Sequence, residues 1–139
     1  MKKTLKTKIN GKRTLIAAML LFIFMLSMSG VAYASSYTTS VKFTNPYSGT
    51  MRSFDGNHIR YSATMSSSKK NDTGKYTIAL DRESGIWAIE VGSKELQRVG
   101  YGEAKWSNVG PGKYRLSFYK NSDGVTLSSS YVVFQNYTP

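Results

Sequence analysis

The stretch from Lys113 to Lys120, KYRLSFYK, contains the pattern that decides the fold. Its apolar residues Tyr114, Leu116 and Phe118 occupy every second position, and the positions between them are mostly polar. Successive side chains of a β-strand point to opposite faces of a sheet. The alternation therefore predicts a strand that buries one face against a core.

The same period of two recurs along the chain, and each stretch that has it is expected to be a strand with one buried face. The last candidate strand, Val125 to Phe134, is less regular, because its segment Tyr131 to Phe134 is apolar on both faces. Either a bulge near Ser129 and Ser130 or a cover on both faces would explain this. The regular sets are Tyr37, Thr39, Val41 and Phe43; Ile59, Tyr61, Ala63 and Met65; Tyr76, Ile78 and Leu80; and Trp87, Ile89 and Val91.

Turn signals separate these stretches. The segments 71–74 and 121–124 share the form Asn-x-x-Gly, in which a type I turn leads to a left-handed glycine in a bulged hairpin loop. Further reversals are expected at 92–94 and at Pro111-Gly112, and a short strand is expected around 51–54.

The chain is therefore predicted to be all-β. No apolar period of 3.6 residues lasts for three turns, although Ser93 to Val99 has room for one helical turn. Seven or eight short antiparallel strands at regular spacing are typical of a β-sandwich.

A resemblance supports this fold class. The segment 106–118, WSNVGPGKYRLSF, followed by Asn-Ser-Asp-Gly-Val, resembles a strand pair of the form V-x-P-G-x-Y-x-L-x-F in immunoglobulin-like and other extracellular sandwiches. It is also similar to the C-terminal half of small, uncharacterised secreted proteins of Gram-positive bacteria. The resemblance implies an immunoglobulin-like sandwich, with a corner at Pro111-Gly112 and the hydroxyl of Tyr114 reaching the loop backbone. It implies no catalytic residue.

The first 34 residues have the three-part pattern of a secretion signal. Six basic residues and no acid lie within 1–13, the apolar run 15–28 follows, and the small-residue frame Ala32-Tyr-Ala34 ends the segment. The alternative is an uncleaved anchor, but the run is shorter than the roughly 20 residues that span a bilayer. We expect cleavage after Ala34, a single domain at 35–139, and a protein that is extracellular or loosely attached to the cell wall. Membrane contact is expected only through the signal segment during export.

Charge and cysteine content narrow the expected partners. Without residues 1–34 the chain keeps 13 of its 19 basic residues against eight acids, a net charge of +5. This charge favours loose attraction to anionic wall polymers, lipids or acidic polysaccharides, although it also serves solubility alone. The chain has no cysteine, so disulfides and thiolate metal sites are excluded.

The residues that could support catalysis form no recognisable motif. His58 is the only histidine and Asp55 lies near it, but no Gly-x-Ser-x-Gly elbow is present, and one histidine cannot form an ordinary zinc site. A glycosidase would need two opposed carboxylates, and neither Asn-x-x-Gly turn is a full calcium loop. We therefore expect no enzyme activity, no metal and no cofactor. The acids available to such sites are Asp81, Glu83, Glu90, Glu95 and Glu103, with Asp55, Asp72 and Asp123 in turns.

A binding surface is the stronger candidate. Four residues alternate with the apolar residues of their strands and are therefore expected to point away from the core: Arg60, Lys75, Arg115 and Tyr119. If they share one exposed sheet face, rings could stack on sugars while basic groups pair with anions. An ordinary solvated face is the alternative.

Two functions lead from the sequence, and a hydrolase is a third, weaker alternative. The first is a secreted, non-enzymatic sandwich that binds an anionic wall polymer, a polysaccharide or a cell surface. The second is an effector that acts on a protein or a membrane, such as an inhibitor, an antimicrobial or a toxin, through sheet edges or an amphipathic hairpin. Nucleic acid is not expected as a partner, since no OB or RRM motif is present, and the oligomeric state is not predicted.

Overall fold

The computed structural model describes residues 35–139, and the expected signal segment at 1–34 lies outside the described residues. The described part of the chain is all-β and contains no helix, so it has no helix that could cross a membrane. The buried apolar side chains among these residues lie between Val41 and Phe134, and all except Ala79 form one cluster. This segment thus has its own hydrophobic core, as a domain that folds alone requires.

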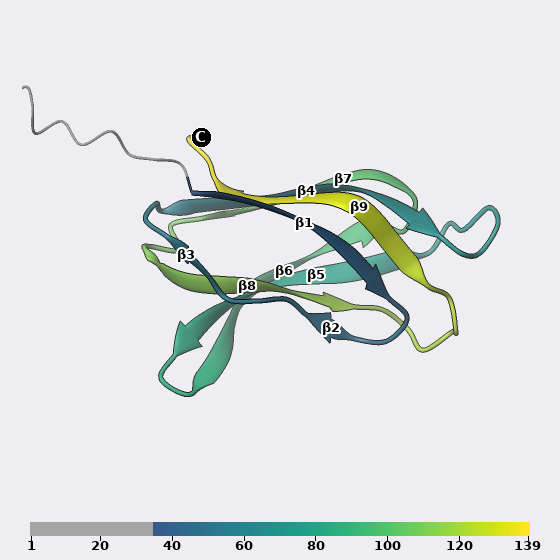
Figure 1. The fold of residues 1–139 in the computed structure, drawn as a ribbon, viewed down its shortest axis with the longest axis horizontal. Coiled ribbons are helices and arrows are strands. Elements are labelled where there is room, and N and C mark those ends of the chain that lie inside the picture. Colours follow the sequence, from purple (N-terminus) through teal and green to yellow (C-terminus); the bar gives the residue numbers. More distant parts are fainter. Residues whose placement is uncertain (1–34) are drawn as a thin grey trace, which may run out of the picture. The chain divides into compact units, whose positions relative to one another are not determined.

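Nine strands make up the described chain (Figure 1). The expected seven or eight become nine because the segment after the first strand forms two short pieces, β2 and β3. The strands are β1 (Ser36–Phe43), β2 (Tyr47–Ser48), β3 (Arg52–Phe54), β4 (His58–Ser67), β5 (Lys75–Ser84), β6 (Trp87–Gln97), β7 (Gly100–Ser107), β8 (Gly112–Tyr119) and β9 (Leu127–Asn136).

The strands form two antiparallel sheets that pack face to face, which confirms the predicted sandwich. Sheet 1 has the order β1-β9-β4-β7. Sheet 2 has the order β2-β8-β5-β6, and β3 also pairs with β8. Within residues 35–139, only β5 and β6 are joined as neighbours in one sheet by a tight turn, because most other connections pass between the sheets.

The immunoglobulin-like part of the prediction is not confirmed. In a constant-type immunoglobulin domain the first and last strands belong to different sheets. Here β1 pairs directly with β9, from Ser36 opposite Gln135 to Phe43 opposite Leu127. The fragment that carries the resemblance folds into β7 and β8 as a corner, a local arrangement that several sandwich topologies share.

That corner has the expected geometry. Tyr114 is fully buried, and its hydroxyl donates to the carbonyl oxygens of Val109 at 2.6 Å and Gly110 at 2.8 Å. The ring therefore fills the core while the phenol fixes the loop that leads into β8.

A bulge in β9 is also confirmed. The register of β9 shifts against both β1 and β4 between Ser129 and Val132. Leu127 and Ser129 face the core before the shift, and Val132 and Phe134 face it afterwards. The bulge thus reverses the parity of the strand and explains why its sequence does not alternate.

Four local expectations are wrong. The reversal expected at 92–94 is absent, because these residues lie within β6 and pair with β5. Trp87, Ile89 and Val91 are 73%, 57% and 41% exposed, because the β5–β6 hairpin projects beyond sheet 1 and no other segment of residues 35–139 covers it (Figure 1). The segment 93–97, in the stretch with room for a helical turn, is strand, since it pairs with β5. In the turn 71–74 the left-handed residue is Asn71 rather than the glycine.

Candidate functional site

The four residues predicted to bind lie on two different faces. Lys75 on β5 and Arg115 and Tyr119 on β8 are on the outer face of sheet 2, out of phase with buried Tyr76 and Leu116. Arg60 on β4 is out of phase with the buried residues of sheet 1, so it lies on the other side of the sandwich. The four side chains therefore do not form one surface.

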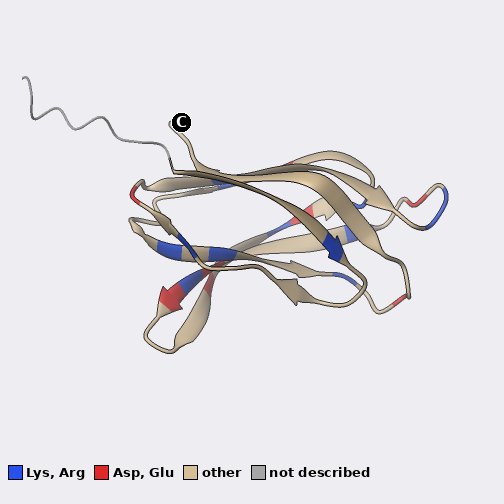
Figure 2. Ribbon diagram, viewed as in Figure 1, with Lys and Arg blue, Asp and Glu red and all other residues tan. Residues whose placement is uncertain are grey.

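The basic groups on the outer face of sheet 2 are matched by acids. Lys75 Nζ lies 3.2 Å from Glu95 Oε2, and Arg115 Nε lies 3.1 Å from Asp81 Oδ2. Asp81 also accepts a hydrogen bond of 2.6 Å from the buried Ser117 hydroxyl. Figure 2 shows basic and acidic positions interspersed along the strands of sheet 2. An anionic polymer would have to compete with these carboxylates for the same cations.

The catalytic candidates are not assembled into a site. His58 Nδ1 is buried and has no hydrogen-bond partner within residues 35–139, so it lacks the carboxylate that orients a catalytic imidazole. Glu90 is exposed on the projecting hairpin. No group of three His, Asp or Glu in the described chain is arranged to hold a metal ion.

Two exposed tyrosines lie on the outer face of sheet 1, on either side of one threonine. Tyr101 on β7 is 68% exposed and pairs directly with Thr64 on β4. Tyr131 on β9 is 63% exposed, and β9 is the other neighbour of β4. Two strand spacings separate the tyrosine backbones, so they lie about 10 Å apart across the sheet. We call this surface the tyrosine face and define it as Ser62, Thr64, Tyr101, Ser130, Tyr131 and Val133.

The β9 bulge positions one of these rings. The Ser129 hydroxyl donates to the Tyr131 carbonyl oxygen at 3.0 Å and accepts from the Tyr131 amide at 3.3 Å. Because the parity changes here, Ser130 and Tyr131 are both exposed, although they are adjacent in the chain. Bulges commonly redirect side chains next to binding sites.

The tyrosine face carries hydroxyl groups and no charge. Its residues line a shallow hollow of about 190 Å³ that also contacts Ala63 and Ser129. Each hydroxyl can donate and accept hydrogen bonds, and each ring offers an apolar surface. These groups can hold a neutral polyhydroxylated ligand, but they supply no acid, base or activated nucleophile.

Charged residues begin at one margin of this face. The Tyr101 hydroxyl lies 3.3 Å from Glu103 Oε2, and Glu103 is paired with Lys105 at 2.6 Å and with Arg60 at 3.7 Å. The hydrogen bond from Lys105 is the main cause that lowers the pKa of Glu103. Of the four predicted residues, Arg60 is thus the one that borders the tyrosine face.

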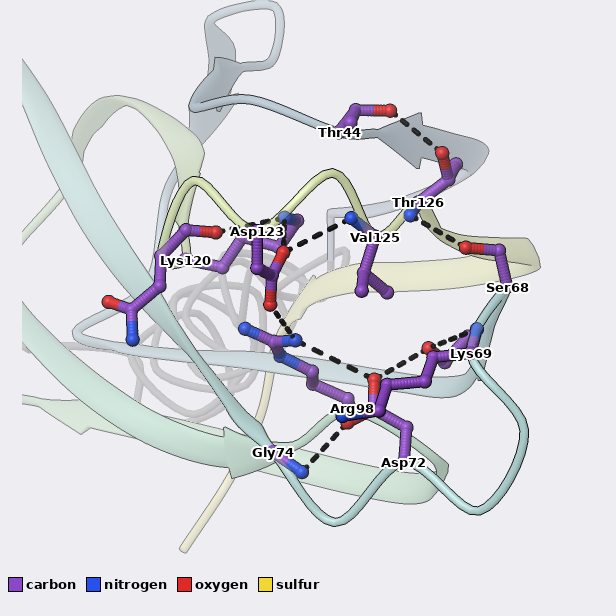
Figure 3. A network of polar contacts seen from close by, with 12 residues as sticks. Thr44, Ser68, Lys69, Asp72, Gly74, Arg98, Lys120, Asp123, Val125 and Thr126 are labelled. Carbon is purple, nitrogen blue, oxygen red and sulfur yellow. Dashed lines mark hydrogen bonds and ion pairs between the residues drawn. The ribbon is translucent and has the colours of Figure 1, made fainter.

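A second, open hollow of about 720 Å³ lies at one end of the sandwich and includes Lys75 and Tyr119 in its lining. It is built around Arg98, which is 5% exposed and contacts Asp72 and Asp123 (Figure 3). Hydrogen bonds from Ser67 and Gly74 lower the pKa of Asp72. Those from Lys120 and Arg98 lower the pKa of Asp123.

These contacts give Arg98 a structural role. Asp72 belongs to the β4–β5 connection, Asp123 to the β8–β9 connection, and Arg98 itself to the β6–β7 turn. One guanidinium therefore ties together three connections between the sheets. Its charge is satisfied by two carboxylates, so it is not available to an anionic ligand.

Comparison with known proteins assigns this chain to no family. Neither a protein-family model nor a curated protein sequence matches this chain. Function must therefore be argued from the arrangement of the residues themselves.

Proposed function

We propose that residues 35–139 are a secreted, non-enzymatic β-sandwich that binds an extracellular polymer of the polysaccharide or cell-wall type. The protein would act outside the cell or loosely attached to its wall. The tyrosine face is the binding surface in this proposal. The observation that carries it is the pair of exposed rings, Tyr101 and Tyr131, on either side of Thr64.

The chemistry of this surface suits sugars. An aromatic ring is apolar on its face, and tyrosine adds a hydroxyl at its edge, so the same residue can stack on a sugar ring and hydrogen-bond to it. Ser62, Thr64 and Ser130 add further donors and acceptors between and beside the rings. Since these residues are uncharged, the proposal favours a neutral polysaccharide over an anionic one, and binding should depend only weakly on salt.

The strand order is compatible with this role. The orders β1-β9-β4-β7 and β2-β8-β5-β6 are those of a jelly roll, if β2 and β3 are counted as one interrupted strand. Lectin domains are among the proteins that use this fold. Fold alone does not establish function, so the exposed tyrosines, rather than the strand order, support sugar binding.

The proposed location depends on the sequence of residues 1–34, which has the pattern of an export signal. The absence of cysteine and the similarity to secreted Gram-positive proteins are consistent with a protein released from such a cell. Detection of a chain that starts at Ser35 in culture medium would support export. Retention of the full chain inside the cell would contradict it.

Binding can be tested with purified residues 35–139 and a panel of insoluble polysaccharides that includes peptidoglycan. The wild-type domain should be retained by at least one polymer, and Tyr101→Ala and Tyr131→Ala should each weaken retention about tenfold, which corresponds to about 1.4 kcal/mol. Tyr119→Ala is the matched control, since Tyr119 is an exposed tyrosine on the outer face of sheet 2. Retention of all three variants at the wild-type level would contradict the proposal, as would failure of the wild type to bind any polymer.

A further inference from the structure

The projecting end of the β5–β6 hairpin exposes a cluster of apolar side chains. Ile86 at the turn is 92% exposed, and Trp87, Ile89 and Val91 follow it on β6. Ile89 and Val91 line one shallow hollow on the hairpin. Figure 1 shows this end of the hairpin standing away from both sheets. The largest apolar patch on a soluble protein is often a functional contact site.

The same segment is an unpaired sheet edge. β6 ends the strand order of sheet 2, so one side of its backbone has no neighbouring strand in the described chain. β6 has one register shift against β5, which leaves Val91 without a paired residue. The other edges are β1, which also has a shift, the eight-residue strand β7, and the short pieces β2 and β3. Long apolar edges favour pairing with another strand. In the projecting segment 87–91 only Glu90 is charged.

We propose that a second copy of this chain covers this surface, with the projecting parts of the two β6 strands paired antiparallel about a two-fold axis at Ile89. Ile89 then faces Ile89 of the second copy. Ala88 faces Glu90 in both directions, and Trp87 lies opposite the bulge at Val91. A contact of this kind is isologous, because each pair occurs twice.

The charge of Glu90 favours the register with the axis at Ile89. With the axis at Ile89, Glu90 is opposite the small, neutral Ala88 of the second copy. Two shifts keep the side-chain faces. The shift that moves the axis to Glu90 would place Glu90 directly opposite its own copy, which is destabilising, and the shift that moves it to Ala88 would place Glu90 opposite the apolar Ile86. The other acids of the hairpin do not add to this repulsion, since Asp81 is paired with Arg115 and Glu83 with Lys113.

The size of the contact is adequate. The exposed parts of Ile86, Trp87, Ile89 and Val91 offer on the order of 500 Å² per copy, so two copies would bury at most about 1,000 Å². This is about the minimum for a specific interface, and backbone hydrogen bonds along the new ladder would add to it. Because the paired segments project from their domains, the two domains lie at opposite ends of the contact and do not collide.

The pairing has a consequence that rests on the proposed function. A two-fold axis perpendicular to sheet 2 keeps the outer faces of both copies pointing in the same direction. The two tyrosine faces, on the opposite side of the sandwich, therefore also point the same way. Two such faces on one particle could engage one polymer surface together, which raises the apparent affinity without any new contact.

Cysteine cross-linking tests the register, since the chain contains no cysteine of its own. Only a residue on the two-fold axis faces itself, and paired strands bring Cα atoms within disulfide range. Ile89→Cys should therefore oxidise to a covalent dimer, whereas Trp87→Cys and Val91→Cys should cross-link slowly alone but readily when mixed. Val99→Cys is the control, since Val99 is 50% exposed at the β6–β7 turn. Equal cross-linking of Ile89→Cys and Val99→Cys would overturn the proposal.

Sedimentation of residues 35–139 gives a second readout. The wild type and Val99→Lys should form dimers, and Ile89→Lys should be monomeric with an unchanged circular dichroism spectrum. A wild type that stays monomeric at all concentrations would overturn the proposal. So would a monomer whose Trp87 emission shifts to the blue with phosphatidylcholine vesicles, because the surface would then be a lipid contact. Dimers that bind no polysaccharide would leave this proposal standing and refute the proposed function alone.

Discussion

The phenol oxygens of Tyr61 and Tyr76 lie 2.9 Å apart in the middle of the core. Tyr61 belongs to β4 in sheet 1 and Tyr76 to β5 in sheet 2, and both rings are almost completely buried. The hydrogen bond between them therefore joins the two sheets. It also satisfies two polar groups that would otherwise be buried without a partner.

Removal of either hydroxyl should destabilise the domain. Tyr61→Phe and Tyr76→Phe each leave one buried hydroxyl unpaired, which costs about 1–3 kcal/mol of the free energy of unfolding. The double variant should lose less than the sum of the two single losses, because no unpaired hydroxyl remains. Urea unfolding of all four proteins measures this coupling. Strictly additive losses would show that the two hydroxyls do not depend on each other.

The same pair should make the domain sensitive to alkali. Burial raises the pKa of Tyr61 above its ordinary value and the pKa of Tyr76 to about 12. Because the folded state favours the neutral phenols, their contribution is complete below the ordinary tyrosine pKa of about 10 and is lost as pH rises toward the folded values. The free energy of unfolding should therefore fall at alkaline pH, and the fall should be smaller in the Tyr61→Phe, Tyr76→Phe double variant. The same slope in both proteins would contradict this.

Acid should weaken the ion pairs that Arg98 forms with Asp72 and Asp123. The pKa values of Asp72 and Asp123 are lowered in the folded state, so their contribution is present above the ordinary Asp value of about 4 and is lost as pH falls below it. Arg98→Met should lower the melting temperature at neutral pH, and the difference from wild type should shrink in acid. Arg60→Met is the control, because its contact with Glu103 is longer and more exposed. Equal effects of the two variants at neutral pH would refute a structural role for Arg98.

The two tryptophans should differ in their effect on stability. Trp87 is 73% exposed, whereas Trp106 is 6% exposed and donates a hydrogen bond of 3.0 Å to the Gly92 carbonyl oxygen. Trp87→Ala should change the unfolding free energy of the monomer by no more than about 0.5 kcal/mol. Trp106→Ala should cost about 3–5 kcal/mol. Chemical unfolding at a concentration below dimer formation compares them, and a large loss for Trp87→Ala would show that the hairpin end packs on the core.

Local signals in the sequence were sufficient for much of the fold. Alternation predicted the buried face of the strand that holds Tyr114, and the contact of its hydroxyl with loop backbone followed from the resemblance. Alternation does not reveal what covers a strand, so Trp87 and Ile89 have the same pattern as core residues although no sheet lies over them.

The candidate site was harder to predict, because it depends on which strands become neighbours. Arg60 and Arg115 each alternate with the buried residues of their own strand, but the strand order places them on opposite sides of the sandwich. Alternation places Tyr101 on the same face of its strand as the charged residues Glu103 and Lys105, so its exposure could be predicted from the sequence. Tyr131 was not predictable in the same way, since its orientation depends on where the β9 bulge reverses the strand.

Nuclear magnetic resonance can locate the sugar-binding surface on the folded domain. Labelled residues 35–139 would be titrated with a soluble oligosaccharide derived from a polymer that retains the domain. If the tyrosine face binds sugar, backbone amide shifts will concentrate at residues 62–64, 101–103 and 130–133, on the three adjacent strands β4, β7 and β9. Shifts centred on Lys75, Arg115 and Tyr119 of sheet 2, with none at Tyr101 or Tyr131, would contradict it.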